Sequence, residues 1–353
     1  MEGRARLAHF WLRKLLFPSQ LSPFYLLIGQ ANQINPFTLP TPDGELLYAW
    51  HILPLGLYAD NEAALLADTS KSDVTQTKAF ALLVDDPESR LVINFHGNAG
   101  TVAQGWRTDT YKALSAGSTA KIHVLAVDYR GFGYSTGSPT EQGVITDAVA
   151  TVDWALQVAK IPPERIVILG QSLGTAVTAA VAEHFISATP RVEFAGLILV
   201  AGFMNIASLL ESYAMFGFVP VLSPLVPIPG LTSWITSHVV DTWDTARRIA
   251  KVVRESEHLH LSLVHAYNDY DIPWEHSDLL FRLAANATSE EGLTREQVDS
   301  AKNTLDLGRA GWINTWNADG KKHIREHIFP AGGHNRLLTF APVALAVLKA
   351  LGV

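Results

Sequence analysis

The chain has 353 residues, of which 48% are hydrophobic and 17% are charged, and its formal net charge is −7. This length fits one large α/β domain with insertions or two smaller domains, and the acidic balance argues against a nucleic-acid partner. Cysteine is absent, which excludes both a disulfide framework and a thiolate nucleophile.

Residues 1–33 are expected to form a helical segment ahead of a main domain at 34–353. The apolar run from Leu7 to Phe17 is broken by charged residues, so it fits neither a standard signal peptide nor a membrane-spanning helix. Its spacing and flanking basic residues favour two alternatives: a helix at a membrane surface through residues 4–17, or a first helix packed on the protein's own core. The compartment stays open between the cytoplasm and an intracellular membrane surface such as the endoplasmic reticulum.

The next elements are a hairpin and an insertion. Two apolar stretches around a Pro-Asp-Gly turn, 37–39 and 46–53, predict an antiparallel hairpin. Residues 55–78 are polar and rich in alanine, which predicts an irregular insertion with a short helix.

From residue 91 onward, apolar runs of strand length alternate with helical stretches. The predicted strands are Leu91–Phe95, Ile122–Asp128, Arg165–Leu169, Phe194–Val200, Leu259–Ala266 and His323–Phe329. The predicted helices lie near 101–116, 140–160, 173–187, 276–286 and 336–350. Continuous apolar strands alternating with helices predict an α/β fold with a mostly parallel central sheet and helices on both faces.

Two stretches interrupt the alternation. We expect 202–257 to be an insertion, and within it the segment from Ser212 to Val240 contains no Asp, Glu, Lys or Arg. Its four prolines exclude a simple spanning helix. The second stretch, 287–321, is polar and is expected to be a surface excursion with a helix near 294–304.

The pentapeptide 170–174, Gly-Gln-Ser-Leu-Gly, lies between a predicted strand and a predicted helix. This is the setting of a nucleophile elbow, in which a tight turn exposes the serine hydroxyl at the end of the sheet. Ser172 is therefore the candidate nucleophile. A serine hydroxyl is a weak nucleophile at neutral pH, so it needs a base within hydrogen-bond reach and a third group that orients the base.

Both partners follow in the chain order Ser, Asp, His, each after a predicted strand. We favour Asp269 as the acid because it comes soonest after the strand Leu259–Ala266, and Asp271 is the alternative. His334 is the candidate base, because it follows the last strand and two glycines that permit a tight loop.

An oxyanion hole needs two backbone N–H groups directed at the developing negative charge. We expect one from Leu173, directly after the nucleophile, and the other from Asn98 in the loop 96–100, His-Gly-Asn-Ala-Gly. The alternative for this loop is an ordinary glycine-rich turn from strand to helix.

Two other patterns have less specific interpretations. Residues 128–135 carry a Gly-x-Gly after a strand, as a dinucleotide site would, but a proline stands where the phosphate-binding helix would begin. We interpret the block as structural, with Asp128 and Arg130 bracing the sheet edge. Three histidines lie on or beside the strand Leu259–Ala266, but carboxylates are scarce there, so we expect no metal and no cofactor.

The stretch Leu91–Pro273 resembles the abhydrolase-domain serine hydrolases, particularly the branch of lysophosphatidylserine and monoacylglycerol lipases. The segments that carry this resemblance are 50–54, 96–100, 128–135, 139–141, 170–174 and 269–273. The resemblance implies an alpha/beta-hydrolase fold and an integral or peripheral membrane enzyme that cleaves single acyl esters from glycerol-based lipids. The chain departs from that branch because no N-terminal transmembrane helix is evident and the excursion at 287–321 is longer than expected.

In this fold, an insertion at 202–257 commonly forms a lid over the serine. An apolar lid suits long alkyl chains better than charged or sugar substrates. The alternative is that the same apolar residues complete the core. The candidate substrate-binding residues are Met215, Phe216, Phe218, Leu222 and Trp234.

The sequence therefore predicts a serine carboxylic ester hydrolase that works through an acyl-enzyme, as a lipase or lysophospholipase on monoacyl lipids. One alternative is a small-molecule esterase, thioesterase or peptidase with the same three residues. Another is a non-catalytic binding protein that keeps the hydrolase fold.

Overall fold

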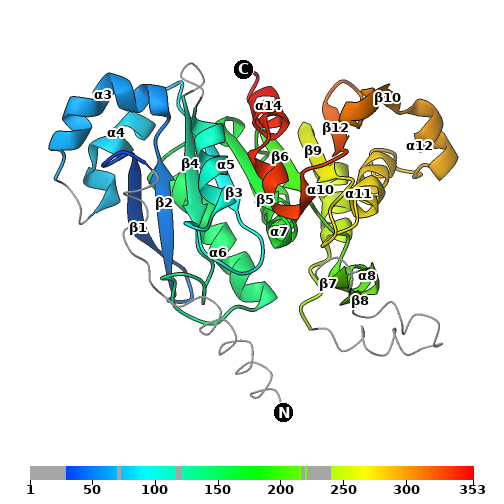
Figure 1. Ribbon diagram of the computed structural model, residues 1–353, viewed down its shortest axis with the longest axis horizontal. Helices are drawn as coiled ribbons and strands as arrows, with labels where there is room; N and C mark the ends of the chain where they lie inside the picture. Colours follow the sequence, from blue (N-terminus) through cyan, green and yellow to red (C-terminus); the bar gives the residue numbers. More distant parts are fainter. Residues whose placement is uncertain (1–28, 70–72, 117–120, 213, 216–218, 221–239) are drawn as a thin grey trace, which may run out of the picture.

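The computed structural model describes residues 29–69, 73–116, 121–212, 214–215, 219–220 and 240–353 (Figure 1). The predicted helical segment 1–33 and the centre of the predicted insertion 202–257 therefore lie largely outside the described residues. Both remain predictions. In the described part, no helix combines the length and apolar character needed to cross a membrane.

A ten-stranded sheet organises the described part of the chain, in the order β1-β2-β4-β3-β5-β6-β9-β12-β11-β10. Its six central strands run parallel to one another, whereas β1, β2, β10 and β11 add antiparallel edges. The strands are β1 Ile34–Pro40, β2 Leu46–Ile52, β3 Arg90–Phe95, β4 Ile122–Val127, β5 Ile166–Gln171, β6 Gly196–Val200, β9 Leu259–Ala266, β10 Asn303–Asp306, β11 Trp312–Ala318 and β12 Lys322–Phe329.

Helices cover both faces of this sheet (Figure 1), which confirms the predicted architecture. One face packs against α4 Lys78–Val84, α6 Glu141–Asp153, α7 Leu173–Ile186, α10 Thr245–Glu255 and α11 Glu275–Asn286. The other packs against α5 Trp106–Ser115 and α14 Ala341–Ala350. In β3, Ile93 faces the first helical layer and Val92 the second, which explains why the central strands are apolar at every position.

The insertion 202–257 contains α8 Ile206–Ser212, the two-residue strands β7 Ala214–Met215 and β8 Val219–Pro220, and α10. Ile249 and Val253 of α10 are fully buried in the same core cluster as α7, so this helix belongs to the layer that covers the sheet. The lid remains a prediction for the residues that precede α10.

Two expectations for the edges of the domain are wrong. The excursion 287–321 contains the predicted helix, α12 Arg295–Ala301, but it also adds β10 and β11 to the sheet. All four residues of β10 are exposed, so this edge strand has no apolar pattern that could predict it. Residues 55–78 hold a 13-residue helix, α3 Leu55–Ala67, rather than a short one, followed by the 3₁₀ turn Val74–Gln76.

Candidate active site

Ser172 stands between β5 and α7 in a strained backbone conformation, with φ 55° and ψ −120°. Its N–H donates to the carbonyl oxygen of Val200 at 3.0 Å, and its own carbonyl accepts the Thr175 N–H at 2.9 Å. A non-glycine residue with positive φ is uncommon and costs energy, and such strain concentrates at functional sites. The geometry is that of the expected elbow, with the side chain turned out at the carboxyl edge of the sheet.

Three glycines permit this turn because any side chain on them would collide with backbone or with the serine. A Cβ on Gly170 would lie 2.0 Å from the Gly174 carbonyl oxygen, and one on Gly174 would lie 2.0 Å from the Phe95 carbonyl oxygen. A Cβ on Gly97 would lie 3.1 Å from the Ser172 Cβ. The last contact places the loop 96–100 directly beside the candidate nucleophile.

His334 and Asp269 meet at the same edge of the sheet. Nδ1 of His334, in α13 Gly333–Arg336, lies 2.8 Å from Oδ2 of Asp269. The carboxylate of Asp269 is fully buried, whereas the imidazole of His334 is 13% exposed. The side-chain amide of Gln171, the residue before Ser172, donates to the His334 carbonyl at 3.0 Å. The structure thus anchors the acid–base pair beside the elbow.

Asp269 rather than Asp271 contacts the histidine. Oδ1 of Asp269 accepts the N–H groups of Asp271 and Ile272, each at 2.9 Å, while Oδ2 lies 2.8 Å from His334 Nδ1 and 3.2 Å from His265 Nε2. Burial raises the pKa of Asp269, but hydrogen bonds from His265 and His334 and their charges outweigh burial and hold this pKa well below its usual range. Asp269 is therefore a carboxylate at neutral pH.

Among the described residues, the ligand atoms of Asp269, Asp271 and His334 lie within 4.8 Å of one another, as a metal site would require. Two of these residues already bond each other in the acid–base pair. The grouping is therefore explained by that pair.

The loop 96–100 is held from behind by a buried arginine. Arg107, on α5 and 4% exposed, donates to the carbonyls of Gly97 at 3.2 Å, Ala99 at 2.8 Å and Thr101 at 2.7 Å. These carbonyls point towards the guanidinium, which leaves the opposite side of the loop to the N–H groups. Asn98 is exposed and Leu173 is half-buried. In the part of the chain that the structure describes, neither the Asn98 nor the Leu173 N–H has a recorded hydrogen-bond partner.

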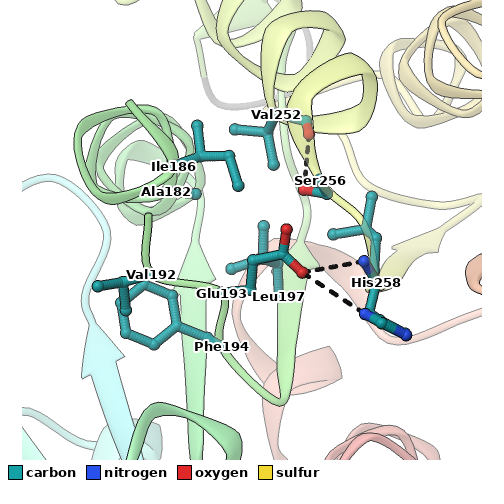
Figure 2. A pocket seen from close by; sticks show the side chains of 10 residues that line it. Ala182, Ile186, Val192, Glu193, Phe194, Leu197, Val252, Ser256 and His258 are labelled. Carbon is teal, nitrogen blue, oxygen red and sulfur yellow. Dashed lines mark hydrogen bonds and ion pairs between the residues drawn. The ribbon is translucent and has the colours of Figure 1, made fainter. Parts of the chain in front are cut away.

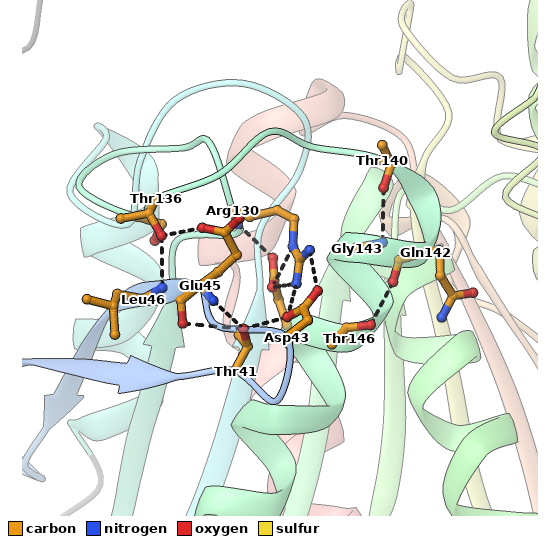
Figure 3. Close-up of polar contacts among 12 residues, drawn as sticks. Thr41, Asp43, Glu45, Leu46, Arg130, Thr136, Thr140, Gln142, Gly143 and Thr146 are labelled. Carbon is orange, nitrogen blue, oxygen red and sulfur yellow. Dashed lines mark hydrogen bonds and ion pairs between the residues drawn. The ribbon is translucent and has the colours of Figure 1, made fainter.

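The block 128–135 braces the structure around this site, as interpreted from the sequence. Oδ1 of Asp128 accepts the Val102 N–H at 2.7 Å. Arg130 makes two hydrogen bonds to Asp43 in the β1–β2 turn, at 2.8 and 2.9 Å (Figure 3). Its Nε donates to the fully buried Asp147 at 2.9 Å. Arg130 thereby ties the hairpin to α6.

Sequence analysis missed two residues of this neighbourhood. Arg107 carries no local signal because its partners are backbone carbonyls of a loop whose path the sequence does not specify. In the sequence, His265 stands out only as one of three histidines on or beside the strand Leu259–Ala266 considered as metal ligands. Its one sequence signal is its place at the end of a predicted strand, four residues before Asp269.

The candidate substrate-binding residues cannot be placed. Phe216, Phe218, Leu222 and Trp234 lie outside the described residues, and of Met215 only the backbone, in β7, is described.

A small pocket elsewhere is separate from this site (Figure 2). It is lined by residues that include Ile186, Phe194, Val252 and Leu259, and thus lies at the amino ends of β6 and β9. Glu193 in its wall accepts the backbone N–H of His258 at 2.9 Å. Ser172, Asp269 and His334 follow the carboxyl ends of their strands, so the pocket lies at the opposite edge of the sheet.

Comparison with known proteins gives the same fold. A model of the alpha/beta hydrolase fold matches residues 90–218. The zebrafish (Danio rerio) lysophosphatidylserine lipase ABHD12 is 28% identical over 266 residues, which cover 74% of this chain and 61% of that protein. Human protein ABHD12B is 29% identical over 318 residues, or 89% and 71% of the two chains. YfhR of Salmonella typhimurium is 27% identical over 193 residues, which cover 55% of this chain and 59% of YfhR.

Solved structures resemble the chain at lower identity. The Pyrococcus furiosus esterase Pf2001 superposes with a TM-score of 0.55 at 14% identity and covers 96% of both chains. Est1E from Butyrivibrio proteoclasticus, solved with ferulic acid bound, has a TM-score of 0.52 at 16% identity and covers 89% of this chain and 96% of its own. At these identities the likeness concerns the fold.

Proposed function

From the premise that this chain has the alpha/beta-hydrolase fold and is distantly related to ABHD12 lysophosphatidylserine lipases and YfhR, we propose that it is a serine carboxylic ester hydrolase. The observation that carries the proposal is the 2.8 Å contact between His334 Nδ1 and Asp269 Oδ2. Gln171, the residue directly before the strained Ser172, anchors this pair by donating to the His334 carbonyl. A nucleophile, a base and an orienting acid at one sheet edge are what acyl transfer requires.

The proposed reaction begins with the proton of Ser172. Nδ1 of His334 carries a hydrogen because it faces the ionised Asp269, so Nε2 is free to accept the hydroxyl proton as the oxygen attacks the acyl carbonyl. The N–H groups of Leu173 and Asn98 would stabilise the oxyanion. His334 then gives the proton to the leaving alcohol, which departs and leaves an acyl-enzyme. Water then attacks the acyl-enzyme and gives a proton to His334; the bond to Ser172 Oγ breaks, the acid leaves, and His334 returns the proton to the serine oxygen.

The substrate class we propose is a monoacyl lipid. Two observations support it: the relatives named as lysophosphatidylserine lipases, and a stretch between Ser212 and Val240 without a charged residue. As a lid, this stretch would offer apolar surface to an alkyl chain. Residues 4–17 would then hold the enzyme at a membrane surface. A short-chain esterase is the second candidate, because the fold also superposes on esterases.

Hydrolysis of p-nitrophenyl esters of rising acyl length separates these candidates. Burial of each methylene contributes about 0.8 kcal/mol, so an alkyl pocket should raise kcat/KM about threefold to fourfold per added methylene until it is filled. Ser172→Ala measured on the same series gives the background. Highest kcat/KM for acetate or butyrate, with a fall at longer chains, would rule out the lipid substrate and favour the short-chain esterase.

A further inference from the structure

His265 is a fully buried histidine that the proposed reaction does not use. It lies in β9, four residues before Asp269, and contacts three groups. Its Nδ1 lies 2.7 Å from the hydroxyl oxygen of Ser277 on α11. Its Nε2 lies 2.9 Å from the Ile272 carbonyl oxygen and 3.2 Å from Oδ2 of Asp269. A second imidazole thus contacts the carboxylate that orients His334.

These partners determine which nitrogen of His265 carries the hydrogen. A backbone carbonyl and an ionised carboxylate only accept hydrogen bonds, so Nε2, which faces both, must be the donor. A hydroxyl can donate as well as accept, so Ser277 can donate to Nδ1 of the neutral ring. The one Nε2–H of His265 is therefore shared between the Ile272 carbonyl oxygen, at 2.9 Å, and Oδ2 of Asp269, at 3.2 Å, the same oxygen that faces His334 Nδ1.

Sharing this oxygen has a geometric and an electrostatic consequence. Oδ1 of Asp269 accepts two backbone N–H groups, and Oδ2 faces two imidazole nitrogens, His334 Nδ1 at 2.8 Å and His265 Nε2 at 3.2 Å, so the carboxylate cannot rotate without losing one of these contacts. A second donor on Oδ2 also reduces the negative charge that the carboxylate presents to His334. The other titratable groups nearby are Asp271, in the same loop as Asp269, and His276 on α11, whose pKa is lowered by burial to about 4.

We propose that His265 is a positioning residue of this site: its Nε2–H holds Oδ2 of Asp269 against His334 and draws part of the carboxylate's charge away from that ring. The proposal rests on the proposed ester hydrolysis. It adds a residue to the site that acts through Asp269 and does not touch the substrate.

Replacing His265 by asparagine and by glutamine tests the contacts of its two ring nitrogens separately. In His265→Asn the short amide reaches the place of Nδ1 and keeps the contact with Ser277, but it cannot reach Asp269. In His265→Gln the longer amide reaches the place of Nε2 and can donate to Asp269. His276→Gln is the matched control, because it removes a neighbouring buried ring whose Nδ1 faces the backbone N–H of Met204.

We expect His265→Asn to lower kcat about 10- to 100-fold with little change in KM, as loss of precise orientation does. With one donor fewer, Asp269 stabilises the charged form of His334 more strongly. The acid limb of the kcat/KM profile should therefore move up by about 0.5–1 pH unit. His265→Gln should keep kcat within a few-fold and leave the limb in place, as should His276→Gln. A folded His265→Asn with wild-type kcat and an unmoved limb overturns the proposal, as does an equal effect in the Asn and Gln variants.

Nitrogen NMR of the wild-type imidazoles tests the same idea without depending on how the variants fold. We expect His265 to be protonated at Nε2, and its Nε2–H resonance to shift as His334 titrates, because both rings share Oδ2. The proposal is overturned if His265 is protonated at Nδ1 alone, or if its Nε2–H resonance does not shift when His334 changes protonation state. Failure of the proposed function is a different result: wild-type protein would then show no ester hydrolysis at all.

Discussion

At the scale of single residues, the site depends on which of two neighbouring carboxylates faces the histidine. Sequence reasoning favours Asp269 over Asp271 only because it follows the strand sooner. The structure adds a physical reason: Asp269 accepts the backbone N–H groups of Asp271 and Ile272, so the loop folds around its carboxylate. Asp271 contributes to that arrangement through its backbone, and any residue but proline can supply the same N–H.

Paired amide variants separate these two aspartates. Asp269→Asn should lower kcat by about 10⁴-fold, because an amide cannot stabilise the charged form of His334 or hold its required tautomer. Asp271→Asn keeps the backbone N–H and should stay within a few-fold of wild type. The comparison is made on p-nitrophenyl ester hydrolysis, with circular dichroism as the folding check. A larger loss in Asp271→Asn would show that the acid has been assigned wrongly.

At the scale of elements, the strands and helices around the site follow from apolar patterning, whereas the path of each loop does not. The six predicted central strands are all present, with ends that differ by no more than two residues. The helix predicted near 336–350 begins later, at Ala341, because two short helical turns precede it. The first, Gly333–Arg336, carries His334, and the second is Leu337–Thr339. The loop 96–100 was predictable from its glycines, but its attachment to Arg107 was not, since that attachment uses backbone carbonyls far from any motif.

Removing the Arg107 guanidinium should therefore disorganise the loop 96–100. In Arg107→Met the carbonyls of Gly97, Ala99 and Thr101 lose the guanidinium, and we expect kcat to fall about 10- to 100-fold while KM changes little. Arg107→Lys keeps one charged donor and should lose less. Lys112→Met, on the same helix with a 57% exposed side chain, is the control and should behave as wild type. Unchanged kcat in folded Arg107→Met would show that the loop needs no such support.

At the scale of the whole molecule, the resemblance to abhydrolase-domain hydrolases and the predicted fold are confirmed. The fold was predictable because the central strands are continuously apolar, as a parallel sheet covered by helices on both faces requires. The antiparallel strands β10 and β11 were missed, since an exposed edge strand such as β10 buries no apolar face. Buried polar pairs were also beyond sequence reasoning. His51 on β2 and His123 on β4 are fully buried, with 3.0 Å between Nε2 of the first and Nδ1 of the second.

This histidine pair predicts a specific loss of stability in acid. Burial lowers the pKa of His51 to about 4, and burial together with the charge of His51 places that of His123 well below its usual value. Both bind a proton near pH 6.5 once unfolded, so the unfolding free energy falls as pH drops from about 6.5 to 4. For His51 the loss at pH 5 is about 2 kcal/mol, and His123 adds a loss of the same sign.

Urea denaturation at pH 7 and pH 5 measures this effect. His51→Gln should reduce the difference in unfolding free energy between the two pH values by about 2 kcal/mol. His258→Gln, which replaces an exposed histidine, should leave it as in wild type. An unchanged acid loss in His51→Gln would mean that other groups cause it.

The central claim is that Ser172 is an activated nucleophile, and covalent labelling with a fluorophosphonate tests it most directly. The folded wild-type protein, digested and analysed by mass spectrometry, should carry one phosphonyl group, on the peptide that contains Ser172. Ser172→Ala should take up none, and His334→Ala should react far more slowly because the serine loses its base. If the folded wild-type protein is not labelled, or is labelled at another residue, the account of this site is contradicted.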